Sequence, residues 1–200
     1  MNRRHVLAAL AASALMARPA AAQAIPLNRI SNYFNALETL EARFSQVNPD
    51  GSRSTGTLYI HRPGRARFEY DPPDRSLVMA GGGQLAIFDG RSNRRRPEQY
   101  PLRQTPLNVI LERRVDLAQS GVVVAHSGTS DATTVVARDP ERPEIGRIAL
   151  VFAEGPLRLT GWMTEDGSGA ITRVSLAEAR SGHAIPARLF SIPNEMRERG

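Results

Sequence analysis

The sequence predicts a mainly β protein with helices, built on one curved antiparallel sheet of about ten strands. Turn-forming groups such as Asn48-Pro49-Asp50-Gly51, Pro63-Gly64 and Asp89-Gly90 recur along the chain, about one every ten residues. Apolar and polar residues alternate between these turns, as they do in half-buried strands. Two other segments show the apolar spacing of a helix instead. This pattern is typical of an antiparallel meander with a helix before it and a helix in its middle.

The N-terminal segment, residues 1–22, is predicted to be a secretory signal peptide, with a possible alternative cut after residue 24. Arg3 and Arg4 precede an apolar run from Val6 to Met16, and small residues follow at positions 20–22. The run is too short to span a bilayer core of about 30 Å. A twin-arginine export signal and a buried amphipathic helix remain as alternatives. We therefore expect residues 23–200 to form a single exported domain.

The composition excludes several classes of site. The chain has no Cys, which rules out disulfides, thiolate metal ligands and cysteine nucleophiles, and an exported chain without Cys suits a bacterial periplasm. All 26 basic residues are Arg, so a single Arg carries little information about a ligand. The basic run at residues 91–96 lacks the interleaved aromatic residues of a nucleic-acid surface. We predict a solvated loop there and no nucleic-acid partner.

The first half of the mature chain is predicted to contain one helix followed by strands. Ile30, Tyr33, Phe34 and Leu37 have the i, i+3, i+4, i+7 spacing of a helix that ends near residues 37–39. Alternation with a period of two begins at Leu40. The strands predicted in this half cover residues 40–45, 55–61, 65–70, 76–80 and 84–88.

A short amphipathic helix is predicted to interrupt the strands after residue 104. Thr105 is a candidate N-cap with Pro106 at the first helical position, and Arg113-Arg114 suit the negative end of the helix dipole. Its apolar side contains Leu107, Ile110 and Leu111. The later strands are expected at residues 121–126, 133–138, 147–152, 157–164 and 170–176, with a last short one at 189–192.

The sequence offers no catalytic or metal-binding motif. The four His residues are dispersed, at positions 5, 61, 126 and 183, without the spacing of metal ligands. There is no G-x-S-x-G nucleophile elbow, and the acidic pair Asp71 and Asp74 stands in turn positions where Asp is common. We therefore expect no enzyme activity, no cofactor and no metal.

A curved sheet with an apolar concave face can either pack that face with its own side chains or leave a cavity beneath covering helices. The inward-facing candidates share apolar character and strand periodicity: Phe44, Leu58, Ile60, Phe68, Tyr70, Leu77, Met79, Leu85, Ile87 and Trp162. The two helices would cover them through Tyr33, Phe34, Leu37, Leu107, Ile110 and Leu111. Periodicity alone leaves an ordinary packed core as the simpler alternative.

Residues 37–89 resemble the LolA family of outer-membrane lipoprotein carriers. The elements that carry the resemblance are Phe44-x-Gln46, Gly56-x-Leu58, Arg62-Pro63, Phe68-x-Tyr70 and the glycine turn at residues 81–83. "TPLNVIL" from Thr105 resembles the central helix of that family, and "LFSIP" from Leu189 resembles its closing segment. The order and spacing of these short motifs, rather than any one of them, carry the resemblance over nearly the whole chain.

The resemblance implies an incomplete β-barrel of about ten or eleven strands, covered by helices that act as a lid over an apolar cavity. It implies a monomeric periplasmic chaperone that carries triacylated lipoproteins from the inner-membrane ABC transporter LolCDE to the outer-membrane receptor LolB. Arg62 would be the latch that hydrogen-bonds to the lid, and Phe68 and Tyr70 would line the cavity. The neighbours Arg65 and Arg67 match no such role and are expected to be solvated.

Two alternatives stay open. The same half-barrel could serve a periplasmic lipid- or glycolipid-binding protein or an envelope sensor, although such sensors usually have further domains and a membrane anchor. A secreted hydrolase without a recognisable motif is the third possibility. The identity of a co-purified ligand, or a polar cleft with a nucleophile beside a base, would separate these alternatives from a lipoprotein carrier.

Overall fold

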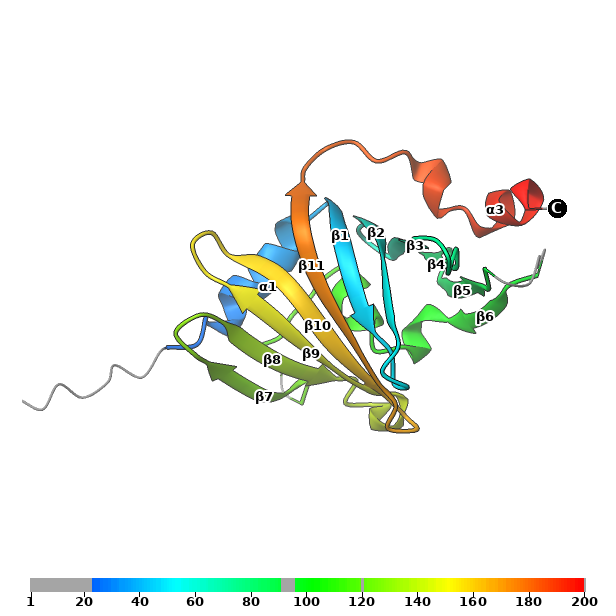
Figure 1. Ribbon diagram of the computed structural model, residues 1–200. Coiled ribbons are helices and arrows are strands. Elements are labelled where there is room, and N and C mark those ends of the chain that lie inside the picture. Colours follow the sequence, from blue (N-terminus) through cyan, green and yellow to red (C-terminus); the bar gives the residue numbers. More distant parts are fainter. Residues whose placement is uncertain (1–22, 91–95, 120, 200) are drawn as a thin grey trace, which may run out of the picture.

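A computed structural model describes residues 23–90, 96–119 and 121–199, and one antiparallel sheet of eleven strands dominates it (Figure 1). The predicted signal peptide, residues 1–22, lies outside the described residues, as does most of the basic run at 91–96. The strands are β1 (Thr39–Val47), β2 (Arg53–His61), β3 (Arg65–Tyr70), β4 (Leu77–Gly81), β5 (Gln84–Phe88), β6 (Glu98–Pro101), β7 (Val123–Gly128), β8 (Thr133–Arg138), β9 (Gly146–Ala153), β10 (Arg158–Asp166) and β11 (Ile171–Ser181).

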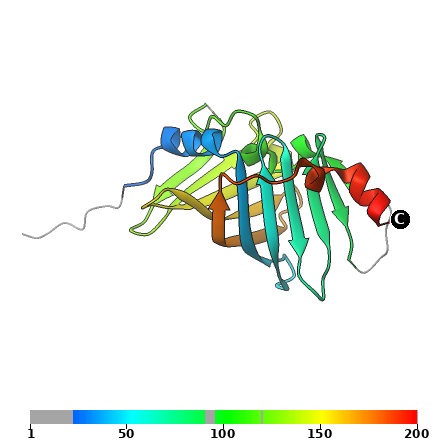
Figure 2. The ribbon, with the colours of Figure 1, turned by 90° about the horizontal axis from the view of Figure 1, so that it is seen from above.

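The strand order, β6-β5-β4-β3-β2-β1-β11-β10-β9-β8-β7, explains how a meander becomes one broad curved sheet. Every neighbouring pair is consecutive in the chain except β1 and β11, which pair in the middle and join the two halves. Among the described residues, β6 and β7 each pair on one side only, so the sheet curves without closing into a barrel (Figure 2). The predicted antiparallel sheet with helices is therefore confirmed.

Helix α1 (Leu27–Ala36) covers the concave face at the β9–β10 end, as its apolar spacing predicts. The Phe34 ring meets Phe152 of β9 edge-to-face at 5.7 Å. The Tyr33 ring meets the same residue at 6.0 Å, and its hydroxyl accepts a hydrogen bond from the Leu159 backbone N–H at 3.3 Å. Three aromatic rings thus fix the helix on the sheet.

A second covering segment, residues 102–117, crosses the concave face and is called the inner cover. It contains the 3-10 turn η1 (Leu102–Gln104) and the helix α2 (Asn108–Leu111), which is shorter than predicted. The expected cap at Thr105 is wrong, because its hydroxyl donates to the Leu102 carbonyl instead of accepting from the helix. Buried Leu102, Ile110 and Leu111 face the sheet, so burial rather than capping holds the segment in place.

The C-terminal segment differs from the prediction of a strand at residues 189–192. It forms the 3-10 turn η3 (Ala187–Phe190) and helix α3 (Ile192–Glu198), here called the outer cover. Ser191 caps α3 by accepting a hydrogen bond from Asn194 N–H, and Pro193 occupies the first turn. Proline has no N–H to donate to a strand ladder but fits a helix start, which explains the difference. The third 3-10 turn is η2 (Pro143–Ile145).

The sheet buries apolar side chains on both faces. The larger cluster fills the concave side, between the sheet, α1 and the inner cover. A smaller cluster on the convex side joins β4 and β5 to the outer cover, and it contains Leu77, Met79, Ala86, Phe88 and Ile192. Within the described ranges, no helix is long and apolar enough to cross a membrane.

Candidate functional site

An open apolar pocket of about 270 Å³ lies on the concave face beside the inner cover. Aromatic side chains from β3 and β10, Phe68, Tyr70 and Trp162, form much of its wall. Residues 105–107 of the inner cover close one side of it. The remaining lining residues are Gln46, Val78, Leu85, Thr164, Asp166, Thr172 and Val174. This pocket is called the apolar pocket below.

The pairing of β1, β2 and β3 brings the aromatic residues together. The Phe44 ring meets Phe68 at 5.7 Å and Tyr70 at 5.1 Å, both edge-to-face, and Phe68 meets Trp162 at 6.1 Å. Gly56 makes room for Phe44, since a Cβ there would lie 2.6 Å from that ring. The motif Gly56-x-Leu58 therefore has a steric reason: a small residue allows the aromatic cluster to form.

Tyr70 gives this wall a polar end. Its hydroxyl donates to Gln46 Oε1 at 2.9 Å. Burial raises the pKa of Tyr70 to about 12, against a smaller lowering from the Gln46 hydrogen bond. The phenol is therefore neutral at physiological pH, and the wall carries no charge at this position.

Arg62 joins the strands to the inner cover. Its guanidinium Nη2 donates to the backbone carbonyl of Glu112, the residue that ends α2, and its Cζ lies 5.9 Å from the centre of the Phe34 ring. The next turn adds a second link, because Gly64 N–H donates to the Leu111 carbonyl at 2.8 Å. The end of α2 is thus bonded to the turn between β2 and β3.

The environment of Arg62 is unusual for a cation. The residue is 8% exposed, and burial lowers its pKa from the ordinary value. In the described part of the chain its guanidinium has no carboxylate partner, and its Nε has no hydrogen-bond acceptor. A buried charge without an ion pair is costly. This contact is therefore held by one carbonyl and a ring, and can be broken without separating two opposite charges.

Most of the predicted cavity residues lie together on the concave side. The concave cluster includes Phe44, Leu58, Ile60, Phe68, Ile110 and Trp162, with Tyr70, Leu85 and Leu107 packed against it. Of these, Phe68, Tyr70, Leu85, Leu107 and Trp162 line the apolar pocket itself. Ile87 pairs with inward-facing Val78 but belongs to neither buried cluster.

The placement of Leu77 and Met79 on the concave face is wrong. Both residues belong to the convex cluster under the outer cover, while their neighbours Val78 and Ala80 face the concave side. Strand β4 reads Leu-Val-Met-Ala-Gly and is apolar at every position, so alternation could not show which set points inward. The prediction was therefore out by one residue along β4, and for that reason it missed Val78, which faces the concave side.

The expectation that Arg67 is solvated is also wrong. Its guanidinium is held on the convex side by Glu195 of α3 at 2.9 Å and by Glu69 at 2.6 Å, and it donates to the Leu189 carbonyl. Arg199 contacts Glu195 from the other side at 2.7 Å. Arg65 instead keeps a half-buried position and donates from Nε to the His61 carbonyl. Sequence periodicity gave no signal for this ion-pair network.

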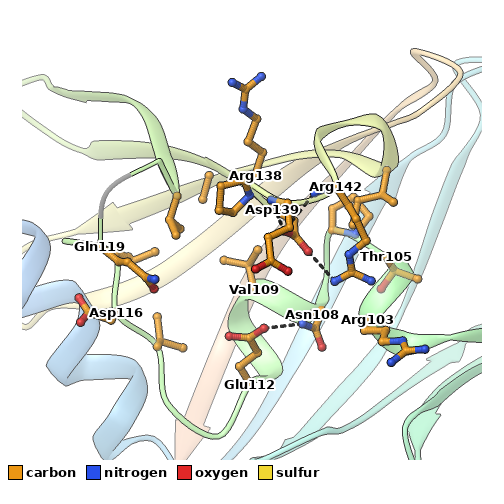
Figure 3. Close-up of a pocket in the computed structure, with 18 of the residues that line it drawn as sticks. Arg103, Thr105, Asn108, Val109, Glu112, Asp116, Gln119, Arg138, Asp139 and Arg142 are labelled. Carbon is orange, nitrogen blue, oxygen red and sulfur yellow. Dashed lines mark hydrogen bonds and ion pairs between the residues drawn. The ribbon is translucent and has the colours of Figure 1, made fainter.

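A second pocket, of about 440 Å³, lies on the other side of α2, between the inner cover and the turn after β8 (Figure 3). Figure 3 shows Asn108 and Glu112 on one wall and Asp139 and Arg142 on the other. Asn108 Nδ2 donates to Glu112 Oε1 at 2.6 Å, and Arg142 pairs with Asp139 at 2.5 Å. Among the residues with described positions, no group of three or more His, Asp or Glu side chains could hold a metal ion.

Comparison with known proteins agrees with this geometry. The family model described as "Outer membrane lipoprotein carrier protein LolA" matches residues 35–193. A protein of Methylococcus capsulatus named outer-membrane lipoprotein carrier protein is 28% identical over 179 residues, which cover 86% of this chain and 85% of that protein. A protein of the same name from Legionella pneumophila is 25% identical, with coverages of 82% and 83%.

A solved structure supports the fold alone. A Vibrio parahaemolyticus domain assigned to outer-membrane lipoprotein sorting aligns with 86% of this chain and 97% of its own length, at 7% identity and a TM-score of 0.51. The family match spans the inner cover, the aromatic wall and Arg62, and it ends at the start of α3. The chain belongs to the LolA family of outer membrane lipoprotein carrier proteins.

Proposed function

We propose that this chain is a periplasmic chaperone that binds the acyl chains of lipoproteins released from the inner membrane and delivers them to an outer-membrane receptor. The observation that carries the proposal is the apolar pocket, walled by Phe68, Tyr70 and Trp162 and bordered by a separate covering segment. Relatives named outer-membrane lipoprotein carrier protein match most of the chain and support the same conclusion. No catalytic step is required of such a carrier.

The physical need for a carrier follows from the cargo. Burial of one methylene is worth about 0.8 kcal/mol, so a chain of about 16 carbons in water is disfavoured by on the order of 10 kcal/mol. The apolar pocket offers such a chain aromatic and aliphatic contacts. Its volume of about 270 Å³ lies just below the roughly 300–1,000 Å³ of typical ligand sites. We infer that the inner cover moves when cargo enters.

Arg62 is proposed as the latch of this movement. Its bond to the Glu112 carbonyl ties the end of α2 to the β2–β3 turn, and it involves no ion pair that would have to be separated. In this proposal the bond is made without cargo and lost when cargo displaces the inner cover. The energy of one such bond, about 0.5–1.5 kcal/mol net for a neutral pair and more for a charged donor, permits reversible opening.

The proposed route has an inner-membrane ABC transporter of the LolCDE type as the donor and a LolB-type receptor as the acceptor. Residues 1–22 would serve as the export signal, and the mature domain would act as a monomer. Apolar cargo enclosed in this way could cross the periplasm without contact with water. The proposed hand-over then requires a receptor site that competes for the same acyl chains.

The decisive experiment adds the purified mature domain to spheroplasts or inner-membrane vesicles that hold a triacylated lipoprotein. We expect release of the lipoprotein as a soluble complex, followed by transfer to the receptor. Arg62→Leu should keep the fold but impair transfer, while the matched control Arg65→Leu, at the start of β3, should transfer as wild type does. Normal transfer by Arg62→Leu would contradict the latch. A different lipid identified by mass spectrometry in the purified protein would favour the lipid-binding alternative.

A further inference from the structure

The apolar pocket has a polar end, and the register of the strands shows where it lies. Trp162 of β10 pairs with Val174 of β11, which in turn pairs with Gln46 of β1. One step nearer to the β10–β11 turn, Thr164 pairs with Thr172. All five side chains line the apolar pocket. Its wall therefore changes from apolar to polar toward that turn.

The side chains at the polar end have hydrogen-bonding capacity that the protein does not use. Gln46 is fixed on both sides, because its Oε1 accepts from the Tyr70 hydroxyl at 2.9 Å and its Nε2 donates to Asn48 Oδ1 at 2.6 Å. The second hydrogen on that Nε2 stays available. Among the described contacts, the hydroxyls of Thr164 and Thr172 have no hydrogen-bond partner. This end of the pocket therefore offers hydrogen-bond donors to a ligand.

The charge at the polar end is negative. Among the described residues that line the apolar pocket, Asp166 is the only charged one. A hydrogen bond from the Ser168 hydroxyl to Asp166 Oδ1 is the main cause that lowers the pKa of Asp166, so its carboxylate is ionised at physiological pH. A ligand with an anionic head would meet a like charge there and no cation. The polar end therefore suits a neutral hydrogen-bond acceptor.

This order of groups matches an acyl chain that is attached through a carbonyl. Trp162 and Thr164 are two residues apart on β10, and so lie on the same face about 7 Å apart along the strand. An apolar tail beside Trp162 would thus place its carbonyl within reach of the donors. The motif Phe44-x-Gln46 follows the same division, because Phe44 packs in the aromatic cluster and Gln46 lies at the polar end.

We propose that Gln46, Thr164 and Thr172 form a carbonyl-binding subsite at the polar end of the apolar pocket. The subsite selects acyl chains attached through a neutral ester or amide over free fatty acids, whose carboxylate Asp166 repels. The tail points toward Trp162, and the polar attachment leaves the pocket at the β10–β11 turn. This inference rests on the proposed function and adds selection of the chemical group that carries the chain.

Two ligands that differ by one carbonyl test the subsite. Trp162 is the only Trp of the chain and lines the pocket, so its fluorescence reports binding of both. The probes are 1-lauroylglycerol, an ester, and 1-O-dodecylglycerol, its ether analogue without the carbonyl. The wild type should bind the ester about tenfold more tightly than the ether, and the double variant Thr164→Val/Thr172→Val should reduce this preference to about twofold or less.

The matched control is Thr134→Val, on the convex face of β8. Thr134 is half-buried like Thr164 and Thr172, and its hydroxyl likewise has no partner among the described contacts. This control should keep the wild-type preference for the ester. A merely structural effect of replacing a strand threonine would change both probes equally and would leave their ratio unaltered.

The exclusion of anions is tested with laurate and Asp166→Asn. The amide keeps an oxygen that can accept the hydrogen bonds of the turn but removes the charge. The Kd of laurate, relative to that of 1-lauroylglycerol, should fall about threefold or more in this variant. An unchanged ratio would overturn the role of Asp166.

The outcomes separate this inference from the proposed function. If the wild type binds neither the ester nor the ether, the proposed function fails. If it binds both with equal Kd, or if the double variant keeps the preference for the ester, only the carbonyl-binding subsite is overturned. Circular dichroism checks the fold, and if the double variant is unfolded, Thr164→Val and Thr172→Val alone should each reduce the preference.

Discussion

The two faces of the sheet are each covered by a helical segment, and the two covers are held by different chemistry. The inner cover is held by Arg62, whose guanidinium donates to the backbone carbonyl of Glu112 in that cover. Among the described residues, Arg62 has no carboxylate partner. The outer cover is bonded through Arg67 to Glu195, with Glu69 and Arg199 completing the network. The two arginines stand five positions apart, on opposite sides of one turn. The Arg62 contact suits a segment that moves, the inner cover, whereas the Arg67–Glu195 ion pair suits a segment that stays in place, the outer cover.

The largest effect is expected from Arg67→Ala. Arg67 and Glu195 are 10% and 11% exposed in their side chains, and loss of one partner of a buried pair costs about 3–5 kcal/mol. Because Arg199 still pairs with Glu195 in the variant, we expect the lower end of this range, about 3 kcal/mol. The free energy of unfolding, measured with urea, should fall by that amount. Arg65→Ala is the matched control and should change it by less than about 0.5 kcal/mol. Equal stabilities for the two variants would show that the outer cover is not fixed by this network.

A smaller loss of stability is expected from Asn35→Ala, which removes the anchor of the inner cover on α1. Two hydrogen bonds to Val115 disappear, and at about 1 kcal/mol each the unfolding free energy should fall by about 2 kcal/mol. Hydrogen exchange at Val115 and Leu117 should accelerate, while exchange in β9 and β10 stays slow. Asn28→Ala, on the same helix but exposed, provides the control. Unchanged exchange at Val115 would contradict this anchoring.

Arg62→Leu should lower the free energy of unfolding by less than Asn35→Ala does. The variant loses one hydrogen bond and the contact with Phe34 but also removes a buried cation and its unpaired Nε. These terms oppose each other, so the unfolding free energy should change by no more than about 1.5 kcal/mol. Hydrogen exchange in α2 should nevertheless accelerate. A loss as large as that of Arg67→Ala would mean that the two covers are equally fixed.

The smallest effect is a pH dependence from His61, the residue next to Arg62. Its ring lies 5.8 Å from that of Phe190 in η3, and its Nδ1 has no hydrogen-bond partner in the described structure. Burial first, and then the charge of Arg65, lower the pKa of His61, against a weaker raising by Glu38. As the pH drops, His61 therefore binds a proton more readily in the unfolded chain than in the folded one. The free energy of unfolding should fall as the pH drops below about 6.5.

His61→Phe provides the test of this pH dependence. The variant keeps an aromatic ring beside Phe190 and removes the titration, so the unfolding free energy should vary less between about pH 7.5 and pH 5.5 than that of the wild type. The other histidines are the same in both proteins, so the comparison isolates His61. An identical pH dependence would exclude His61 as its source.

Local sequence patterns predicted most of the strands and the helix of the inner cover, but not the helix of the outer cover. The spacing of Ile30, Tyr33 and Phe34 predicted α1, and alternation or an apolar run between turns predicted ten of the eleven strands. Strand β6 was missed because "EQYP" is mostly exposed and carries no apolar alternation. Helix α2 is shorter than predicted, and helix α3 forms where a short strand was predicted, because both depend on what they pack against rather than on propensity alone.

The candidate site was predicted unevenly for a related reason. Phe68 and Trp162 are large inward residues of strands with clear alternation, and they lie on the pocket wall as expected. Leu77 and Met79 sit in a strand that is apolar on both faces, and the second pocket combines segments that are distant in sequence. Its lining residues share no local signal, since each is a common loop or strand residue on its own.

The sequence by itself determined the sheet, its turns and the alternation that puts Phe44, Phe68 and Tyr70 on one face, because these depend on neighbours a few positions apart. It also contained the family motifs around Arg62. Only the tertiary structure decided which residues of β4 point to the concave side and which to the convex side. It also decided that Arg62 holds the inner cover and Arg67 the outer cover. The physical reason is that burial of Arg67 against Glu195, and of Arg62 against the end of α2, depends on contacts across 128 and 50 residues of chain.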